Sequence, residues 1–190
     1  MIIFLNGPPH SGKDTVAGII KKLLPNCGEY KMSKPLKDAF KSIFPFPPEF
    51  SAKLLEEYKD EPFYNGIDIT PRQFQINLSE ELIRPMFGKD VFGNIACMSL
   101  RQMPYKHIVI SDSGFEEEIK PIFKMFGPQR TLGIVISRTG CDYDNDSRSD
   151  LDFHSLGITW DLLDNKYDLE LLEEQVKRIL RSHGVLEDND

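Results

Sequence analysis

The residues with the clearest capacity for chemistry lie between Gly7 and Thr15, in the order G-P-P-H-S-G-K-D-T. Gly7, Gly12 and Lys13 fit the spacing G-x-x-x-x-G-K, between an apolar run and a helical pattern, which is the context that this motif requires. Glycine lets a backbone wrap closely around a polyphosphate, and the N–H groups of such a loop then face the anion. The spacing predicts a phosphate-binding loop in which Lys13 neutralises the β and γ phosphates. The alternative is a glycine turn that binds no phosphate.

The residue after Lys13 is Asp14, where the motif usually carries a magnesium-binding Ser or Thr. Asp14 either adds a carboxylate to the metal shell or is a favourable acid in the first helical turn. Thr15 is the stronger candidate for a phosphate or metal contact. His10 is more consistent with a spacer than with a catalyst, because phosphoryl transfer needs little beyond positioning and charge stabilisation. The loop residues predicted to contact the nucleotide are Gly7, His10, Ser11, Gly12, Lys13, Asp14 and Thr15.

A second acid, Asp112, follows the apolar run 107–111. Open α/β sheets bind ligands at the carboxyl ends of their strands. In a phosphate-loop protein an acid at this place holds magnesium, directly or through water. The other role open to Asp112 is to cap the next helix. The predicted metal-binding residues are Asp112, Thr15 and Asp14.

Five apolar segments alternate with helical patterns, and these elements have to position the residues named above. The alternation predicts an α/β protein with a five-stranded parallel sheet and helices on both faces. Together with the phosphate loop this is the three-layer P-loop NTPase fold. The predicted strands are 2–6, 30–32, 107–111, 132–137 and 158–162.

Apolar residues recur at helical spacing within 16–24, 36–44, 115–126 and 169–180, the last behind a capping Asp168. Another helix start is Thr70-Pro71-Arg72-Gln73, with a capping Thr and a proline at the first helical position. This start lies in the least regular part of the chain. We predict that residues from about 34 to 104 form a helical insertion over the carboxyl-terminal edge of the sheet.

The formal net charge of −7 argues against binding to a nucleic-acid polymer but leaves room for a local pocket for one small anion. The three cysteines have no metal-ligand spacing, which favours reduced thiols over a disulfide or a zinc site. No apolar run is long enough to span a membrane, and the apolar start is too short for a signal peptide. We therefore expect a cytoplasmic protein, in the host cytoplasm if the source is a phage.

Several segments in the same order resemble the deoxynucleoside monophosphate kinase family of bacteriophages. The resembling segments are the phosphate loop, Met32-Ser33-Lys34-Pro35-Leu36-Lys37, Thr70-Pro71-Arg72-Gln73, Arg84, Phe87-Gly88-Lys89-Asp90, Ile108-Val109-Ile110-Ser111-Asp112 and Asp164-Asn165. Only the phosphate loop is specific by itself. The resemblance implies that Arg72 and Arg84 hold the monophosphate of the acceptor, which suits the match between a guanidinium and a phosphate. Ser33 and Lys37 are weaker candidates for that pocket. The alternative is that these residues are solvated helix positions.

The chain departs from that family after Asp112, where an Arg is expected and Ser113-Gly114-Phe115-Glu116 stands instead. This stretch predicts a capping box, Ser113 with Glu116, for the next helix. The missing Arg removes one implied contact with phosphate or acceptor.

The loop ending G-K-D-T also resembles the G-K-x-T ending of adenylate-kinase-like enzymes, which close an arginine-bearing lid over the phosphates. The resemblance places the lid at about 138–156, where Arg138 and Arg148 are the candidate catalytic residues besides Lys13. The alternative is a surface loop with internal ion pairs, because five acids surround these arginines. Asn165 stands where related folds contact the base of the nucleotide donor.

These observations predict one P-loop kinase domain, with a core at about 1–33 and 105–183. We expect ATP and Mg2+ as cofactors, a deoxynucleoside monophosphate as acceptor, and no membrane or polymer partner. The sequence does not decide whether the protein forms a homodimer. It also leaves two alternative functions, a P-loop kinase for a non-nucleotide phosphorylated metabolite and a nucleotide-binding switch without kinase activity. The arginines of the insertion favour a nucleotide kinase, because a switch needs no second anion pocket.

Overall fold

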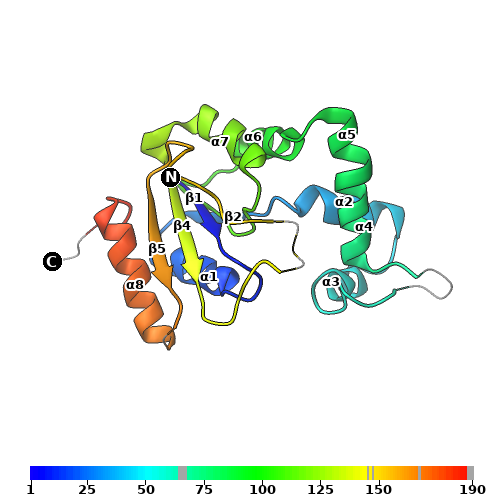
Figure 1. The fold of residues 1–190 in the computed structure, drawn as a ribbon, viewed down its shortest axis with the longest axis horizontal. Helices are drawn as coiled ribbons and strands as arrows, with labels where there is room; N and C mark the ends of the chain where they lie inside the picture. Colours follow the sequence, from blue (N-terminus) through cyan, green and yellow to red (C-terminus); the bar gives the residue numbers. More distant parts are fainter. Residues whose placement is uncertain (64–67, 145, 147, 167, 188–190) are drawn as a thin grey trace. The chain divides into compact units, whose positions relative to one another are not determined.

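The computed structural model describes residues 1–63, 68–144, 146, 148–166 and 168–187. Within them, a five-stranded sheet has the order β2-β3-β1-β4-β5, and every neighbouring pair is parallel (Figure 1). Its strands are β1 (Ile2–Asn6), β2 (Cys27–Tyr30), β3 (His107–Ile110), β4 (Thr131–Ser137) and β5 (Trp160–Asp164). The central strand β1 leads into the loop at Gly7, so that loop lies at the carboxyl edge of the sheet, where such sheets bind ligands.

The five predicted strands are present, but β4 begins one residue earlier than predicted and β2 and β5 are shifted by two or three residues. β2 begins at Cys27, where Gly28 has no side chain to reveal a strand. A Cβ on Gly28 would stand 2.2 Å from the Tyr105 ring, so this glycine makes room for an aromatic side chain. β5 begins at Trp160, because the buried Ile158 belongs to the preceding turn, where its N–H bonds to the Phe153 carbonyl.

Helices cover both faces of the sheet. On one face, α1 (Lys13–Leu23) and α8 (Leu169–Ser182) share a buried cluster with Ile3 and Leu5 of β1. On the other face, α6 (Val91–Gln102) and α7 (Glu116–Phe126) lie with Ile2 and Ile108, and Phe4 stacks on Phe153. The alternation along β1 therefore produces the predicted three layers, and the predicted α/β class with a five-stranded parallel sheet is confirmed.

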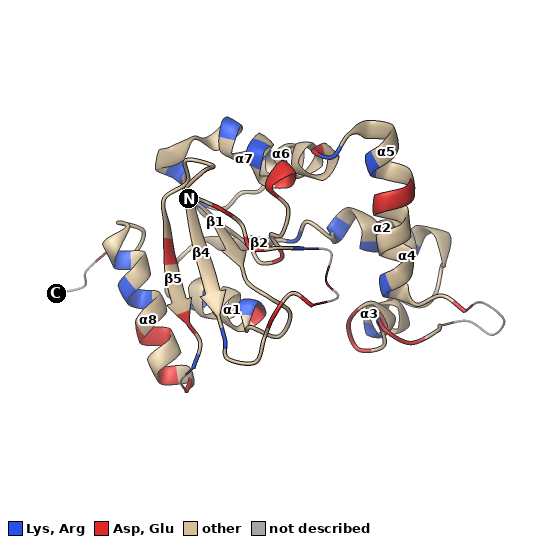
Figure 2. Ribbon diagram, in the orientation of Figure 1, with Lys and Arg blue, Asp and Glu red and all other residues tan. Residues whose placement is uncertain are grey.

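The helix that carries Lys13 is held to α8 by charge as well as by apolar contact. Lys22 of α1 pairs with Glu173 of α8 at 3.1 Å. In α8 the acids gather in the N-terminal half and the bases in the C-terminal half (Figure 2), which complements the helix dipole. None of the described helices has the length and hydropathy that a membrane span requires.

Two of the three predicted helix starts are confirmed. Thr70 accepts a hydrogen bond from the Gln73 N–H, and Asp168 accepts one from the Leu171 N–H. The capping box at Ser113 is wrong. α7 begins at Glu116 behind Phe115, because the Ser113 hydroxyl turns back and donates to the Ile110 carbonyl at 3.4 Å.

The chain divides into two compact units, 1–32 with 93–190 and Ser33–Phe92. The second unit consists of α2 (Lys34–Ile43), α3 (Pro48–Glu56), α4 (Pro71–Asn77), the π-helical η1 (Leu78–Ile83) and α5 (Arg84–Phe87). Its core is aromatic, since the Phe40 ring centroid lies 5.0 Å from Phe44 and Phe63 and 5.3 Å from Phe74. This unit ends before residue 104, because α6 continues into the first unit, where Gly93 lies against the Glu118 backbone.

Candidate phosphate-binding site

The loop between β1 and α1 has the backbone geometry of a closely wrapped turn. The Ser11 N–H bonds to the Pro8 carbonyl at 3.2 Å, and both His10 (φ 63°) and Gly12 (φ 99°) are left-handed. Gly12 then caps α1, because its carbonyl accepts the first intrahelical bond from the Val16 N–H at 3.0 Å. The N–H groups of the first turn of α1 therefore follow directly on the loop.

The two motif glycines serve different needs. A Cβ on Gly7 would stand 2.5 Å from the Ile136 carbonyl oxygen of β4, so the loop can pass that strand only without a side chain. A Cβ on Gly12 would stand 2.4 Å from Asn165 Nδ2, and the positive φ of Gly12 disfavours other residues as well. Both glycines are therefore required by this fold of the loop.

Lys13 folds back over the loop, and its Nζ donates to the Gly7 and Pro8 carbonyls at 2.6 Å each. Burial, followed by the charge of Arg148, lowers the pKa of Lys13 to about 8. The acids that oppose this shift are Asp14, Asp146 and Asp112. A partly dehydrated ammonium is a group whose charge a nearby anion would stabilise.

Ser11 is fully buried, and its hydroxyl has no hydrogen-bond partner among the described residues. This hydroxyl faces Gly7 across the loop, 2.8 Å from where a Cβ on Gly7 would stand. Buried hydroxyls are nearly always paired, so an orphaned one in this loop points to a partner that comes with a ligand. Thr15 is exposed in the first turn of α1.

Asp112 and Asp14, the acids predicted to bind metal, lie near Lys31 and Glu29 in a group of hydrogen-bonded and ion-paired residues, which is called the corner below. Asp112 follows β3, and its Oδ1 accepts a hydrogen bond from the Met32 N–H at 2.7 Å. Asp14 accepts one from Lys31 Nζ at 2.8 Å, and Lys31 also lies 3.9 Å from Glu29. Burial opposes the charge of Lys31, but the Asp14 hydrogen bond and the nearby acids outweigh it and raise its pKa.

The sequence does not reveal Lys31 as part of this corner, because a lone lysine after a short strand carries no pattern. No group of three or more His, Cys, Asp or Glu in the described ranges is arranged to hold a metal ion by itself. The metal roles of Asp14, Thr15 and Asp112 stay predictions.

Asn6, the last residue of β1, ties the loop region to two other segments. It is fully buried, and its Nδ2 donates to the Ser113 and Ser149 carbonyls at 3.1 Å each. Its Oδ1 accepts from the Leu151 N–H at 3.0 Å. The strand end therefore holds residues 149–151 against the carboxyl edge of the sheet. In the sequence, this role of Asn6 could have been inferred from its place as a polar residue at the end of an apolar strand.

Arg138 and Asn165 both contact the phosphate loop. Arg138 Nη1 donates to the His10 carbonyl at 3.1 Å, and Asn165 Nδ2 donates to the Ser11 carbonyl at 2.8 Å. The Asn165 backbone is fixed in turn, because its N–H bonds to the Ser137 carbonyl at 2.8 Å. Asn165 thus supports the loop, and its predicted contact with a base is untested.

Within the predicted lid, residues 138–144, 146 and 148–156 are described, and Asn145 and Ser147 lie outside the described residues. Arg148 forms a two-pronged pair with Asp146, at 2.8 Å from Nε and 2.6 Å from Nη2. The Tyr143 hydroxyl is buried near Asn6 and the Gly7 backbone. Burial, followed by the charge of Asp150, raises the pKa of Tyr143 to about 12. The internal ion pair expected of a surface loop is therefore present, but it lies beside the phosphate loop.

The four predicted acceptor-binding residues all lie in the second unit, and three of them are ion-paired there. Arg72 forms a two-pronged pair with Asp60 on the surface. Arg84 is buried, donates to the Ser79 hydroxyl at 3.1 Å, and lies 3.3 Å from Glu80. Lys37 pairs with Glu56, and Ser33 caps α2 through its backbone alone.

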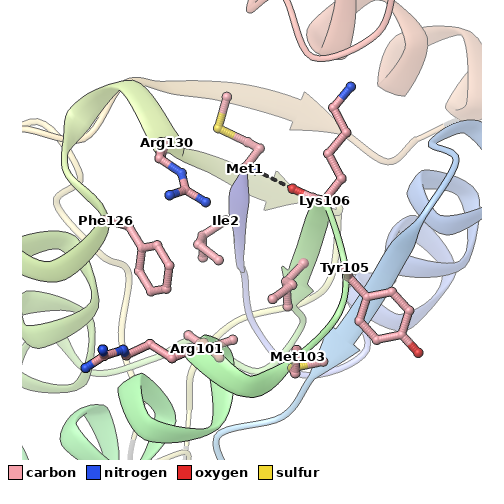
Figure 3. A pocket seen from close by; sticks show the side chains of 10 residues that line it. Met1, Ile2, Arg101, Met103, Tyr105, Lys106, Phe126 and Arg130 are labelled. Carbon is pink, nitrogen blue, oxygen red and sulfur yellow. Dashed lines mark hydrogen bonds between the residues drawn. The ribbon is translucent and has the colours of Figure 1, made fainter.

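A pocket of about 280 Å3 lies at the opposite edge of the sheet, at the amino ends of β1 and β3 (Figure 3). Ile2 and Ile108 are in its lining, and the Arg130 guanidinium lies 5.4 Å from the Phe126 ring centroid. The Lys106 side chain extends away from it (Figure 3). Because parallel sheets bind ligands at their carboxyl ends, this pocket is not the candidate site.

No protein-family model and no curated protein matches the chain. Solved structures with similar folds include a sugar kinase from Janibacter sp. HTCC2649, with a TM-score of 0.42, 14% identity and coverage of 98% of both chains. A thymidylate kinase from Candida albicans has a TM-score of 0.47 and 13% identity, over 100% of this chain and 95% of that chain. A tunicamycin resistance protein from Deinococcus radiodurans has a TM-score of 0.46 and 10% identity, over 94% of both chains. Likeness at this level supports no conclusion about function, which must come from the chain's own residues.

Proposed function

We propose that the chain is a P-loop kinase that transfers the γ-phosphoryl group of ATP to a deoxynucleoside monophosphate. The observation that carries the proposal is the loop after β1. It combines a left-handed Gly12, a dehydrated Lys13 and an unpartnered buried Ser11 hydroxyl. The left-handed φ of Gly12 lets the loop turn closely, and a polyphosphate would offset the cost of burying the Lys13 charge and the Ser11 hydroxyl, which has no partner among the described residues.

The residues of the corner suit magnesium, which prefers carboxylate and hydroxyl oxygens and takes only one or two carboxylates from a protein. Asp112, with Asp14 and Thr15, would hold the ion. Bound Mg2+ supplies neutralisation of phosphate charge. At the edge of the site, the Asp14 carboxylate accepts a hydrogen bond from Lys31 Nζ at 2.8 Å.

Transfer requires that an acceptor phosphate oxygen bonds to the γ phosphorus while the bond to the β–γ bridging oxygen breaks, so that ADP leaves. Lys13 and Arg148 provide the fixed positive charge for the oxygens that gain charge in this step. Arg138 is a third candidate, held at the loop by the His10 carbonyl. Arg72 and Arg84 would grip the acceptor phosphate so that its attack is in line.

Thermal-shift screening tests the proposal directly. The chain is melted with each deoxy- and ribonucleoside monophosphate, with and without magnesium and a non-hydrolysable ATP analogue. A ligand at a hundred times its Kd stabilises by about 2.7 kcal/mol, which raises the Tm of a chain of this size by about 5–10 °C. We expect the analogue and one deoxynucleoside monophosphate each to produce such a shift.

Two outcomes would contradict parts of the proposal. If the analogue leaves the Tm unchanged at millimolar concentration, the loop does not bind a triphosphate. If the analogue stabilises but no monophosphate does, the acceptor is a different metabolite or the chain is a nucleotide-binding switch.

Arg72→Ala should raise the KM for the acceptor about tenfold to a hundredfold and change the Kd for the ATP analogue less than about twofold, since one charge-assisted phosphate contact is lost. Steady-state kinetics with isothermal titration would measure both. Because Arg72 also pairs with Asp60, Asp60→Asn is the matched control, which breaks the pair and keeps the guanidinium. An equal loss of acceptor use in both variants would reduce Arg72 to a structural role.

A further inference from the structure

Gly114 is a glycine that its backbone conformation does not require. It is absent from the positive-φ glycines, so alanine could adopt its conformation. What excludes alanine is Arg148. A Cβ on Gly114 would stand 2.4 Å from Arg148 Cγ and 2.6 Å from both its Cβ and its Cδ. Because the Arg148 Cβ is among these atoms, rotation of the side chain cannot relieve the contact, and the backbone at 148 would have to move.

Arg148 is held from the other side by Asp146. The carboxylate accepts hydrogen bonds from Arg148 Nε at 2.8 Å and from Nη2 at 2.6 Å. It also accepts one from the Arg148 backbone N–H at 2.9 Å. The next residue is fixed too, since the Ser149 N–H bonds to the Gly114 carbonyl at 3.3 Å and the Ser149 carbonyl accepts from Asn6. Both the stem and the guanidinium of Arg148 therefore have a defined place.

That place is at the start of the phosphate loop, close to Lys13. The Ser149 carbonyl, one residue after Arg148, accepts a hydrogen bond from Asn6 Nδ2 at 3.1 Å, and the next residue, Gly7, accepts one from Lys13 Nζ at 2.6 Å through its carbonyl. In agreement with this geometry, the charge of Arg148 is the largest of the charges that lower the Lys13 pKa. An arginine has five N–H donors, and among the described residues the pair with Asp146 uses two of them, those of Nε and Nη2. The side chain is about one quarter exposed, so the guanidinium is not sealed in the interior.

We propose that Gly114 and Asp146 are positioning residues that hold Arg148 beside Lys13 before any substrate binds. Arg148 is then a built-in part of the phosphoryl-transfer site, and closure of the segment 138–156 is not needed to deliver it. The resemblance to the kinase family implies an arginine just after Asp112, where this chain has Ser113 and Gly114. Arg148, from a later segment, places a guanidinium side chain against Gly114 in that turn. This inference rests on the proposed kinase function for its catalytic part alone.

A double-mutant cycle tests it, with Gly114→Ala, Arg148→Gly and the two combined. Glycine at 148 removes all three atoms that a Cβ at 114 would meet. We expect either single change to lower kcat about tenfold to a hundredfold with both KM values within about twofold, because the lost contact acts on transition-state charge. The double variant should be no slower than Arg148→Gly. The Tm should fall with Gly114→Ala in the wild type and stay unchanged when the substitution is added to Arg148→Gly.

Two further variants make the result decisive. Gly18→Ala is the matched control, since a Cβ there meets nothing within 4 Å, and it should leave kcat unchanged. Asp146→Asn keeps one acceptor oxygen and removes the partner of Nη2 without any steric clash. It should lower kcat in the wild type and lower it much less in Arg148→Gly, where only its charge near Lys13 is lost, even if Gly114→Ala fails to fold.

Losses that add in the double variants, in kcat or in Tm, would overturn the inference, because they would show that Gly114 or Asp146 acts independently of Arg148. Wild-type protein without turnover on any monophosphate would instead overturn the proposed function. In that case the Tm cycle would still decide whether Gly114 makes room for Arg148.

Discussion

Lys13→Ala should lower kcat/KM for phosphoryl transfer by about a thousandfold or more and leave the fold intact. The ammonium is the cation closest to the loop, with two loop carbonyls at 2.6 Å. Its pKa is lowered to about 8, mainly by burial, so the ammonium is less stable here than in water although it is still the main form at neutral pH. Removal of this partly buried charge should cost the fold little, whereas a bound triphosphate would lose its main counter-charge. Coupled-enzyme kinetics and thermal melting would measure the two effects separately.

Lys22→Ala is the matched control for this experiment. Lys22 belongs to the same helix, is mostly exposed, and pairs with Glu173 on the surface. Its loss should leave turnover near the wild-type value, since exposed pairs contribute at most about 1 kcal/mol. Near-normal turnover of Lys13→Ala would remove Lys13 from the mechanism, and a large drop in its Tm would make the lysine a structural residue.

The parts of the molecule that the sequence predicts are those encoded by neighbouring residues. The loop from Gly7 to Thr15 can be predicted because its glycines and lysine have a fixed spacing. β1, β3 and β4 can be predicted because a strand covered on both faces is an unbroken apolar run. The start of α4 can be predicted because Thr70 caps the helix with its own side chain. Each of these signals lies within about ten residues of the chain.

The parts that the sequence does not predict depend on residues distant in the chain. The contact of Arg148 with Gly114 and the bond from Asn165 to the Ser11 carbonyl join segments that only the folded sheet brings together. Ser113 is a case in which contacts in the folded protein override a local sequence pattern. Its local pattern predicts a helix cap, but the residue is buried at the end of β3 and its hydroxyl bonds to the strand instead.

Gly12→Ala should raise the Kd for an ATP analogue more than about tenfold and lower the Tm, for two separable reasons. A left-handed φ of 99° costs a residue with a Cβ about 1–2 kcal/mol. The new Cβ would also stand 2.4 Å from Asn165 Nδ2, the group that supports the Ser11 carbonyl. Relief of either strain would move the backbone of the loop that is proposed to bind the phosphates. Titration calorimetry and thermal melting would record both effects.

Two companion variants separate the backbone cost from the steric cost. Gly184→Ala also places a Cβ at a positive φ, 63°, but meets nothing within 4 Å, so its loss of Tm measures the backbone cost alone. The double variant Gly12→Ala with Asn165→Ala removes the clash and keeps the positive φ. If Asn165 packs on the loop as described, the double variant should be more stable than Gly12→Ala alone and bind the analogue more tightly. A double variant that binds more weakly than either single one would mean that Asn165 contacts the nucleotide itself, because only then does its amide contribute affinity beyond its support of the loop.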